Sequence, residues 1–243
     1  MRDYKLETEK RVAFIKKAMA DAHADGIVFG NSGGKDSALV GILCKMACSN
    51  VLGVIMPCQS KRNFGEDMDD GMDVAKQFNI ETITVDLTSV KEEMVKQIES
   101  VTSATDTAKS NIAPRLRMTT LYTIAQSRNA MVAGTGNKCE LYMGYFTKWG
   151  DGGCDINPIA DLTVSEIYEF LTYLNAPENI IKKAPSAGLF EGQTDEQEMG
   201  VTYKQIEEVM ATGTTDDKEA AEKIIRINAR TEHKRRMPLW YAD

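Results

Sequence analysis

The residues best suited to chemistry in this chain stand in one short run, Ser32-Gly33-Gly34-Lys35-Asp36-Ser37. An apolar run precedes it at residues 27–29, and an apolar helical pattern follows it at residues 38–43. A glycine-rich turn between a strand and a helix lets the backbone approach a phosphate closely, and the N-terminus of the helix directs free N–H groups toward it. This first glycine turn therefore predicts a binding site for the phosphates of a nucleotide.

Asp36 separates this turn from two commoner phosphate-binding turns. A Walker A loop needs Gly-x-x-x-x-Gly-Lys-Ser/Thr, and a dinucleotide fingerprint needs a third glycine three residues after the second. Because a carboxylate repels phosphate unless a cation lies between them, the run predicts that the nucleotide binds together with Mg²⁺. The pattern resembles the PP-loop of ATP pyrophosphatases, which transfer AMP from ATP and release pyrophosphate. An ordinary strand-to-helix turn that happens to be rich in glycine is the alternative.

A second glycine turn, Gly134-Thr135-Gly136-Asn137-Lys138-Cys139-Glu140, follows another apolar run at residues 131–133. The hydroxyl of Thr135 can hydrogen-bond a phosphate or the edge of an adenine ring. Glu140 can reach a metal ion held by Asp36 if the two turns lie together. Two carboxylates from different loops, with phosphate oxygens, are the ligands that an Mg²⁺–ATP site needs.

Arg115 and Arg117 begin a helical stretch that leads into the run at residues 131–133. Residues two apart on a helix do not face the same side, so we expect one arginine to face the site and the other to face solvent. Arginine suits phosphate and carboxylate because its donors form a planar fork. A solvated surface arginine is the alternative for each.

Charged residues also accompany the later loops of the chain. Lys148 and Asp155 flank a glycine-rich loop, and glycines at that density indicate close approach of a ligand or of another backbone. Residues 184–200 form a polar stretch with little periodicity, which is typical either of a lid or of a mobile connector. His233 and Lys234 place a cationic pair near the end of the chain, where an anionic substrate can meet it.

The elements that must position these residues alternate along the first half of the chain. Strand-like runs occur at residues 27–29, 51–56, 82–85 and 131–133, and helical patterns occur near 37–48, 66–78, 88–101 and 115–128. This alternation predicts one α/β domain with a parallel twisted sheet and helices on both faces. Ligands bind beyond the carboxyl ends of such strands, so the four loops that follow the strands are expected to line one site. Further helices are expected at residues 3–25, from Thr163, from Thr202 and at 216–230.

Composition limits the classes of partner and compartment. A chain of 243 residues can form one large domain with a full core. A net charge of −7 disfavours general binding to nucleic acid. The polar N-terminus shows no signal peptide, no apolar run reaches the length of a membrane span, and five cysteines without a Cys-x-x-Cys pair fit a reducing compartment. We therefore expect a cytoplasmic protein without a nucleic-acid or membrane partner.

Taken together, these segments resemble the ammonia-dependent NAD synthetases, in their short bacterial and archaeal form. The matching pieces run in family order from residue 30 to residue 235, and they are SGGKDS, RLRM, GTGNKCE, GYFTKWGDGGCDINP, KAPSAGLFEGQTDE and HKR. The resemblance implies that ATP adenylates the carboxylate of deamido-NAD (nicotinic acid adenine dinucleotide) and that ammonia displaces AMP, which gives NAD and pyrophosphate. It also implies an adenine nucleotide alpha hydrolase-like, Rossmann-like fold and a homodimer.

The same resemblance assigns roles to individual residues. The implied ATP-binding residues are Gly30, Ser32, Gly33, Gly34, Asp36, Ser37, Thr135 and Ser186. The implied deamido-NAD-binding residues are Arg115, Lys148, Asp155, His233 and Lys234. The implied Mg²⁺ ligands are Asp36 and Glu140. Residues 1–243 are expected to form a single synthetase domain without a glutaminase domain, so that ammonia arrives free or from a partner protein.

The chain departs from the family pattern at two places. Val164 stands where the family often has a lysine near ATP, and Ala113-Pro114 stands where a Lys-Ala pair is usual. Lys182 or Lys183 is a candidate for the missing cation.

Two alternative functions remain open from the sequence. One is another PP-loop enzyme that forms amides or modifies tRNA, and a tRNA enzyme would need a basic face, which the acidic charge balance disfavours. The other is a nucleotide-binding module without catalytic activity. Such a module should tolerate loss of Asp36 and Glu140, and this chain has both.

Overall fold

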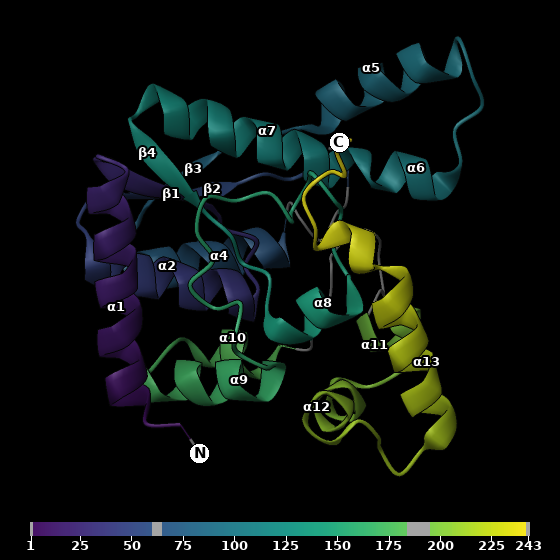
Figure 1. Cartoon of the computed structure of the whole chain (residues 1–243). Helices are drawn as coiled ribbons and strands as arrows, with labels where there is room; N and C mark the ends of the chain where they lie inside the picture. The colour runs from purple at the N-terminus through teal and green to yellow at the C-terminus, as the bar shows by residue number, and fades with distance from the viewer. Residues whose placement is uncertain (1, 60–64, 184–194, 242–243) are drawn as a thin grey trace.

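The computed structural model describes residues 2–59, 65–183 and 195–241. Its centre is a sheet with strand order β3-β2-β1-β4, in which all neighbouring strands are parallel (Figure 1). The strands are β1 (Gly26–Gly30), β2 (Val51–Ile55), β3 (Glu81–Thr84) and β4 (Ala130–Ala133). The predicted parallel sheet is thus confirmed, and its two central strands, β1 and β2, are almost fully buried.

Alternate residues of β1 point to opposite faces of the sheet, and each face has its own apolar core. Ile27 and Phe29 belong to the core that the helices of one face complete, whereas Val28 belongs to the core beneath the other face. The first face carries α1 (Tyr4–Asp21), α2 (Lys35–Ala47) and α4 (Glu66–Gln77), and the second carries α7 (Ile112–Ser127) (Figure 1). Helices therefore cover both faces, as the alternation predicted.

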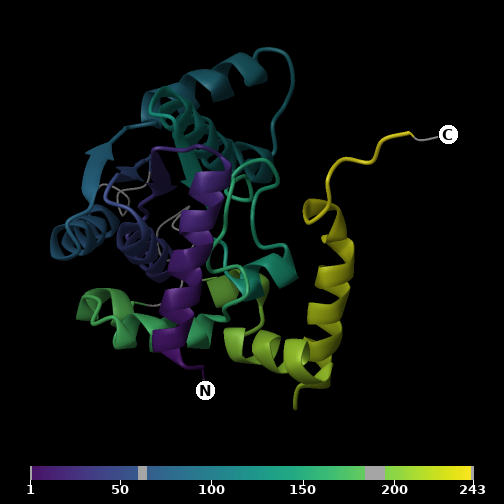
Figure 2. The ribbon, with the colours of Figure 1, turned by 60° about the vertical axis from the view of Figure 1, so that its left-hand side comes forward.

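A third apolar cluster lies outside the sheet and is built from helices of the C-terminal part. Met143, Ile206 and Ile224 are almost fully buried in it. Figure 2 shows α13 (Lys218–Arg230) running along the side of the molecule at a distance from the sheet, and it packs on α8 (Lys138–Met143) and α12 (Tyr203–Thr212). The remaining helices are α5 (Thr88–Glu99), α6 (Asp106–Ser110), α9 (Val164–Tyr173), α10 (Glu178–Lys182), α11 (Asp195–Met199) and η1 (Glu232–Lys234).

Local sequence signals explain where several of these helices begin. Thr163 and Thr202 each accept a hydrogen bond from the backbone N–H three residues later, and the side chains of Glu166 and Gln205 accept one from the N–H of the cap residue. Both predicted helix starts are therefore confirmed. The first helix is shorter than predicted because it ends at Asp21, and His23 then adopts a φ of 51°, which a helix does not permit.

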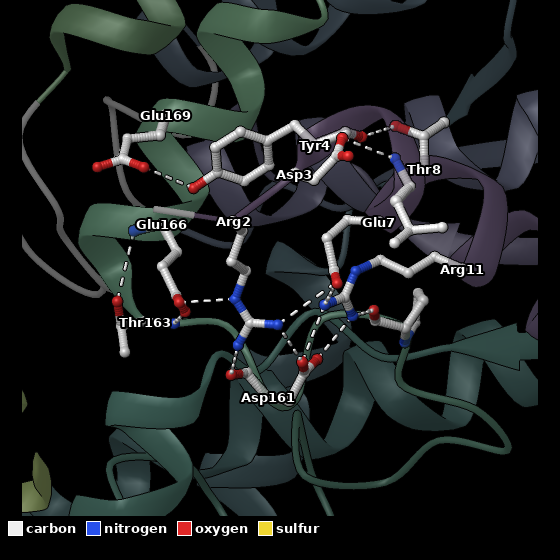
Figure 3. Close-up of polar contacts among 12 residues, drawn as sticks. Arg2, Asp3, Tyr4, Glu7, Thr8, Arg11, Asp161, Thr163, Glu166 and Glu169 are labelled. Carbon is white, nitrogen blue, oxygen red and sulfur yellow. Dashed lines mark hydrogen bonds and ion pairs between the residues drawn. The ribbon is translucent and has the colours of Figure 1, made fainter.

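An ion cluster anchors the N-terminus to the middle of the chain (Figure 3). Arg11 donates from Nη1 to the Pro158 carbonyl and to Asp161 Oδ1, both at 2.6 Å. Arg2 donates from Nε to Glu166 Oε1 at 2.6 Å, so it ties the start of the chain to α9. The loop at residues 157–162 is in turn bonded to the second glycine turn, because the Lys138 N–H donates to the Leu162 carbonyl at 2.8 Å. The N-terminal segment is thereby linked, through this loop, to the second glycine turn.

Two findings bear on expectations outside the sheet. Residues 184–194 of the predicted polar stretch lie outside the described residues, and residues 195–199 form α11. Among the described helices none combines the length and the apolar character that a membrane span requires.

Candidate active site

The two glycine turns leave adjacent strands at the same end of the sheet. Phe29 of β1 lies opposite Ala133 of β4, and each strand ends at or just after this pair. The turns contact each other directly, since Asn137 donates from Nδ2 to Asp36 Oδ1 at 3.2 Å. The parallel sheet thus brings together two segments that are about a hundred residues apart in the sequence.

Gly33 has a backbone position that only glycine can fill. Its φ is +70°, and a Cβ built on it would lie 2.0 Å from the Asp67 carbonyl oxygen. Gly34 then serves as the N-cap of α2 and provides no capping side chain. The first N–H groups of this helix of 13 residues therefore have no side-chain acceptor at its cap, which is the arrangement that binds phosphate.

Asp36, Glu140 and Lys35 form a largely buried charged group where the turns meet. Lys35 donates from Nζ to Asp36 Oδ2 at 2.8 Å. Glu140 accepts at Oε2 from the Asn137 N–H at 2.9 Å, which completes a capping box that starts α8. Burial and the charge of Asp36 raise the pKa of Glu140 well above its usual range. Burial alone would lower the pKa of Lys35, but Asp36 and Glu140 outweigh it and raise that pKa.

The two carboxylates fit a divalent ion that arrives with other ligands. Among the described residues no three His, Cys, Asp or Glu side chains gather into a complete metal site. Mg²⁺ is usually held by one or two carboxylates, while phosphate oxygens and water complete its shell. Asp36 and Glu140 therefore suit Mg²⁺ bound together with a nucleotide.

A cavity of about 690 Å³ opens over the two turns, a size that accommodates a small-molecule substrate. Five of the predicted ATP-binding residues line it, namely Gly30, Ser32, Gly34, Asp36 and Thr135. Gly33 and Ser37 do not line it; Ser37 instead donates from Oγ to the Gly34 carbonyl at 3.0 Å and holds the first turn together. The eighth predicted residue, Ser186, lies outside the described residues.

The loops after three of the four strands contribute to this cavity, and the expectation for the fourth is wrong. Met56 and Pro57, which follow β2, join the two glycine turns in the lining. Within the described part of the chain, the loop after β3 does not reach it. β3 lies at the edge of the sheet that is remote from β1 and β4, and the Leu87 N–H donates to the Pro57 carbonyl at 3.0 Å, so this loop packs against the loop after β2.

The structure separates the two arginines of α7. Arg117 is largely buried, lines the cavity and donates from Nε to the Met56 carbonyl at 3.0 Å. Arg115 is exposed and donates from Nη2 to the Lys148 carbonyl at 3.4 Å, beside the cavity-lining Thr147. One arginine thus faces the cavity, as expected, and it is Arg117. The role of Arg115 in binding deamido-NAD stays a prediction, now for the rim of the cavity.

The other predicted substrate residues divide into two places. Lys148 donates from Nζ to the His233 backbone carbonyl at 2.5 Å, and Arg115 donates to the Lys148 carbonyl, so these three residues are neighbours next to the cavity-lining Thr147 and Lys234. Lys234 lines the cavity and donates to the Phe146 carbonyl at 2.7 Å. Asp155 lies apart at the edge of β4, where it accepts from the Tyr122 hydroxyl at 3.0 Å and from the Val132 N–H at 2.7 Å.

Comparison with known proteins bears directly on this arrangement. A family model described as NAD synthase matches residues 7–238. The chain belongs to the NAD synthase family. The NH3-dependent NAD+ synthetase of Carboxydothermus hydrogenoformans is 46% identical over 239 residues, which cover 97% of each chain. The expectations of ammonia-dependent NAD synthesis and of an enzyme that forms a C–N bond are thereby confirmed.

Solved structures of NAD synthetases and a related enzyme share the whole fold. The NH3-dependent NAD synthetase of Campylobacter jejuni, solved in complex with the nitrate ion, has a TM-score of 0.81 at 32% identity and full coverage of both chains. The NMN synthetase of Francisella tularensis has a TM-score of 0.93 at 38% identity, with 99% of each chain covered. The predicted fold class of an NAD synthase domain is confirmed.

The departures from the NAD synthase pattern are explained by packing. Val164 is 5% exposed and belongs to the third apolar cluster, so it does not line the cavity. Ala113 is buried in the core beneath α7, and Pro114 occupies the first turn of that helix, where its missing N–H leaves no helical hydrogen bond unmade.

Lys183 brings a cation to the first glycine turn. Its Nζ donates to Asp67 Oδ1 at 2.8 Å and to Asp70 Oδ2 at 2.5 Å, and it lies 3.4 Å from the Gly33 carbonyl. Lys182 points to solvent and pairs with Glu178. Sequence reasoning offered both lysines and gave no role to Asp67. The signal that separates the two lysines is the end of α10 at Lys182, which turns the next residue away from the helix surface.

Proposed function

We propose that this chain amidates the carboxylate of deamido-NAD with ammonia, using ATP through an acyl-adenylate and releasing AMP and pyrophosphate. One observation carries the proposal: Asp36 and Glu140, on turns of neighbouring strands, lie beside an uncapped helix N-terminus in one cavity. That combination suits a triphosphate bound with Mg²⁺. The rival reading as a module without activity gives no reason for two carboxylates at this place.

The position of each residue in the cavity then suggests its role in the reaction. The N–H groups at the start of α2 and the Ser32 hydroxyl bind the phosphates that become pyrophosphate. Mg²⁺, held by Asp36 and Glu140, would neutralise charge on the phosphate oxygens as the α-phosphate is attacked. Lys183 contacts the Gly33 carbonyl, and the guanidinium of Arg117, which bonds the Met56 carbonyl, adds positive charge to the lining of the cavity. A preorganised set of cations suffices, because the substrate carboxylate is itself the nucleophile.

The basic group of Arg115, Lys148 and His233, with Lys234 beside it, suits the anionic deamido-NAD at the rim of the cavity. We extend the proposal to a homodimer in the cytoplasm, one synthetase domain per chain, with free ammonia as the nitrogen source. Asp155 is exposed at the outer edge of β4, so in this proposal it meets a dinucleotide at the contact between two copies. Sedimentation equilibrium with and without deamido-NAD tests the dimer.

A second candidate substrate is the mononucleotide, nicotinic acid mononucleotide, which would give NMN by the same chemistry. The close match in structure to the Francisella NMN synthetase favours it, with a TM-score of 0.93 against 0.81 for the Campylobacter NAD synthetase. Both substrates present the same nicotinate carboxylate, and only the dinucleotide has an AMP half to occupy the basic rim. The ratio of kcat/KM for the two substrates decides between them.

The deciding experiment supplies ATP, Mg²⁺, ammonium and each carboxylate substrate to the purified protein and separates the products by chromatography. We expect AMP in equal amount to NAD or NMN. Asp36→Asn should lower the rate by at least about a hundredfold, because it removes a carboxylate at the point where phosphate charge is neutralised. ADP as the product, or no amide from either substrate with folded protein, would refute the proposal.

A further inference from the structure

Lys35 is a buried cation that the proposed reaction does not use. It is 6% exposed, and its Nζ donates to Asp36 Oδ2 at 2.8 Å. Glu140 is near enough to act on it electrostatically, so both predicted metal ligands stabilise the charge of this ammonium. A lysine buried at this depth must be paired, and here its partners are the two groups that a divalent ion also needs.

Two aromatic rings confine the ammonium on its other sides. Its Nζ lies 5.7 Å from the centre of the Tyr203 ring and 6.0 Å from that of Tyr168. Tyr203 is itself fixed, because it is 4% exposed and its hydroxyl donates to Asp195 Oδ2 at 2.8 Å. Cation–π attraction and burial therefore hold the ammonium beside the carboxylates.

The placement has an electrostatic consequence for the metal. Without Lys35, two largely buried carboxylates that both bond Asn137 would have no cation beside them, and like charges in such a place repel each other. With Lys35, one of the two negative charges is already balanced. A divalent ion that entered alone would bring net positive charge to these three groups, and the ammonium would repel it. A triphosphate that enters with the ion offsets that repulsion.

We propose that Lys35 is a positioning residue that takes the electrostatic place of the metal in the nucleotide-free protein, so that the divalent ion enters together with the nucleotide. The inference rests on the proposed Mg²⁺–ATP site and adds an order of binding to it. Lys35 keeps Asp36 and Glu140 in position while the site is empty and suppresses binding of a metal ion without its nucleotide.

The test is Mn²⁺ titration of the nucleotide-free protein, followed by electron paramagnetic resonance of the unbound ion. Lys35→Met removes the charge and keeps most of the apolar stem, and Lys35→Gln removes the charge and keeps a donor. We expect each to bind Mn²⁺ at least tenfold more tightly than the wild type. Lys45→Met is the matched control, because Lys45 lies on the same helix about 15 Å further along and bonds only the Ser49 carbonyl among the described residues.

Asp36→Asn in the Lys35→Met background should abolish the gained affinity, which places the ion at this site. Unchanged or weaker Mn²⁺ binding in the Lys35 variants overturns the proposal, since a merely structural lysine predicts that outcome. A gain that survives Asp36→Asn overturns it as well. If circular dichroism shows Lys35→Met unfolded, Lys35→Gln decides alone. The titration needs no substrate, so a wild type that forms AMP and shows no such gain refutes this inference and leaves the proposed function standing.

Discussion

Replacing Lys183 by methionine tests whether the ammonium beside the first glycine turn holds the turn in place. The side chains of Lys183, Asp67 and Asp70 are only 10–12% exposed, so the ion pairs are shielded from water. Methionine keeps the apolar stem and removes the charge. The adjacent Lys182→Met is a matched control, because Lys182 and its partner Glu178 have side chains 74% and 82% exposed.

The expected magnitudes follow from that difference in burial. Removing one partner of a buried ion pair leaves uncompensated charge and typically lowers the free energy of unfolding by about 3–5 kcal/mol. An exposed pair at helical spacing contributes about 0.3–0.5 kcal/mol. We therefore expect Lys183→Met to destabilise the protein by about 3 kcal/mol more than Lys182→Met. For a chain of 243 residues this corresponds to a Tm lower by about 6 °C.

Urea denaturation, followed by circular dichroism, measures both variants on the same scale. The double variant Lys183→Met/Asp70→Asn should be more stable than the sum of the single changes predicts, by about 1 kcal/mol or more, because the second change removes a carboxylate left unpaired by the first. Equal losses of unfolding free energy in Lys183→Met and Lys182→Met would refute the reasoning. So would a double variant whose loss equals the sum of the two single losses.

Two further predictions concern the first glycine turn and the N-terminal ion cluster. In urea denaturation, Gly33→Ala should lower the free energy of unfolding by about 2 kcal/mol more than Gly213→Ala. Both glycines have positive φ, but a Cβ at Gly33 would collide with Asp67, whereas no atom of the described residues lies within 4 Å of one at Gly213. Equal losses would show that the turn moves to admit the methyl group. Burial raises the pKa of Asp161, but its hydrogen bond and ion pair with Arg11 outweigh this and leave that pKa lowered. A carboxylate with a lowered folded-state pKa stabilises the fold above its unfolded pKa and loses this contribution as the pH falls. The difference in free energy of unfolding between the wild type and Asp161→Asn should therefore be largest above about pH 5 and shrink below about pH 4. A difference that stays constant down to about pH 3 would contradict this prediction.

Features with a short-range cause could be predicted from the sequence. The first glycine turn lies between an apolar run and a helical pattern. The alternation of strands and helices predicts a parallel sheet, in which both glycine turns follow the carboxyl ends of their strands. Thr163 and Thr202 predicted the starts of their helices because each has a capping partner three residues later, Glu166 or Gln205. The meeting of Asp36 and Glu140 at one sheet edge followed from the parallel order, which the structure has.

Features that depend on packing could not be predicted. Spacing alone states that Arg115 and Arg117 face different sides, but only the position of β2 determines that Arg117 meets the Met56 carbonyl. The choice of Lys183 over Lys182 depends on where α10 ends relative to α4. Lys35 reads as an ordinary member of a glycine-rich run, and its burial becomes visible only once the rings of α9 and α12 are placed beside it.

The N-terminal ion cluster has a consequence for folding during synthesis. Arg2 and Glu166 are separated by 164 residues, so this one pair can form only after Glu166 has been synthesised. At about 5–20 residues per second, translation alone imposes a delay of roughly 8 to 33 seconds. The four strands of the described sheet are made within that interval. The first helix can therefore pack on α2 early, whereas its link through Arg2 to α9 closes only after the sheet has been synthesised.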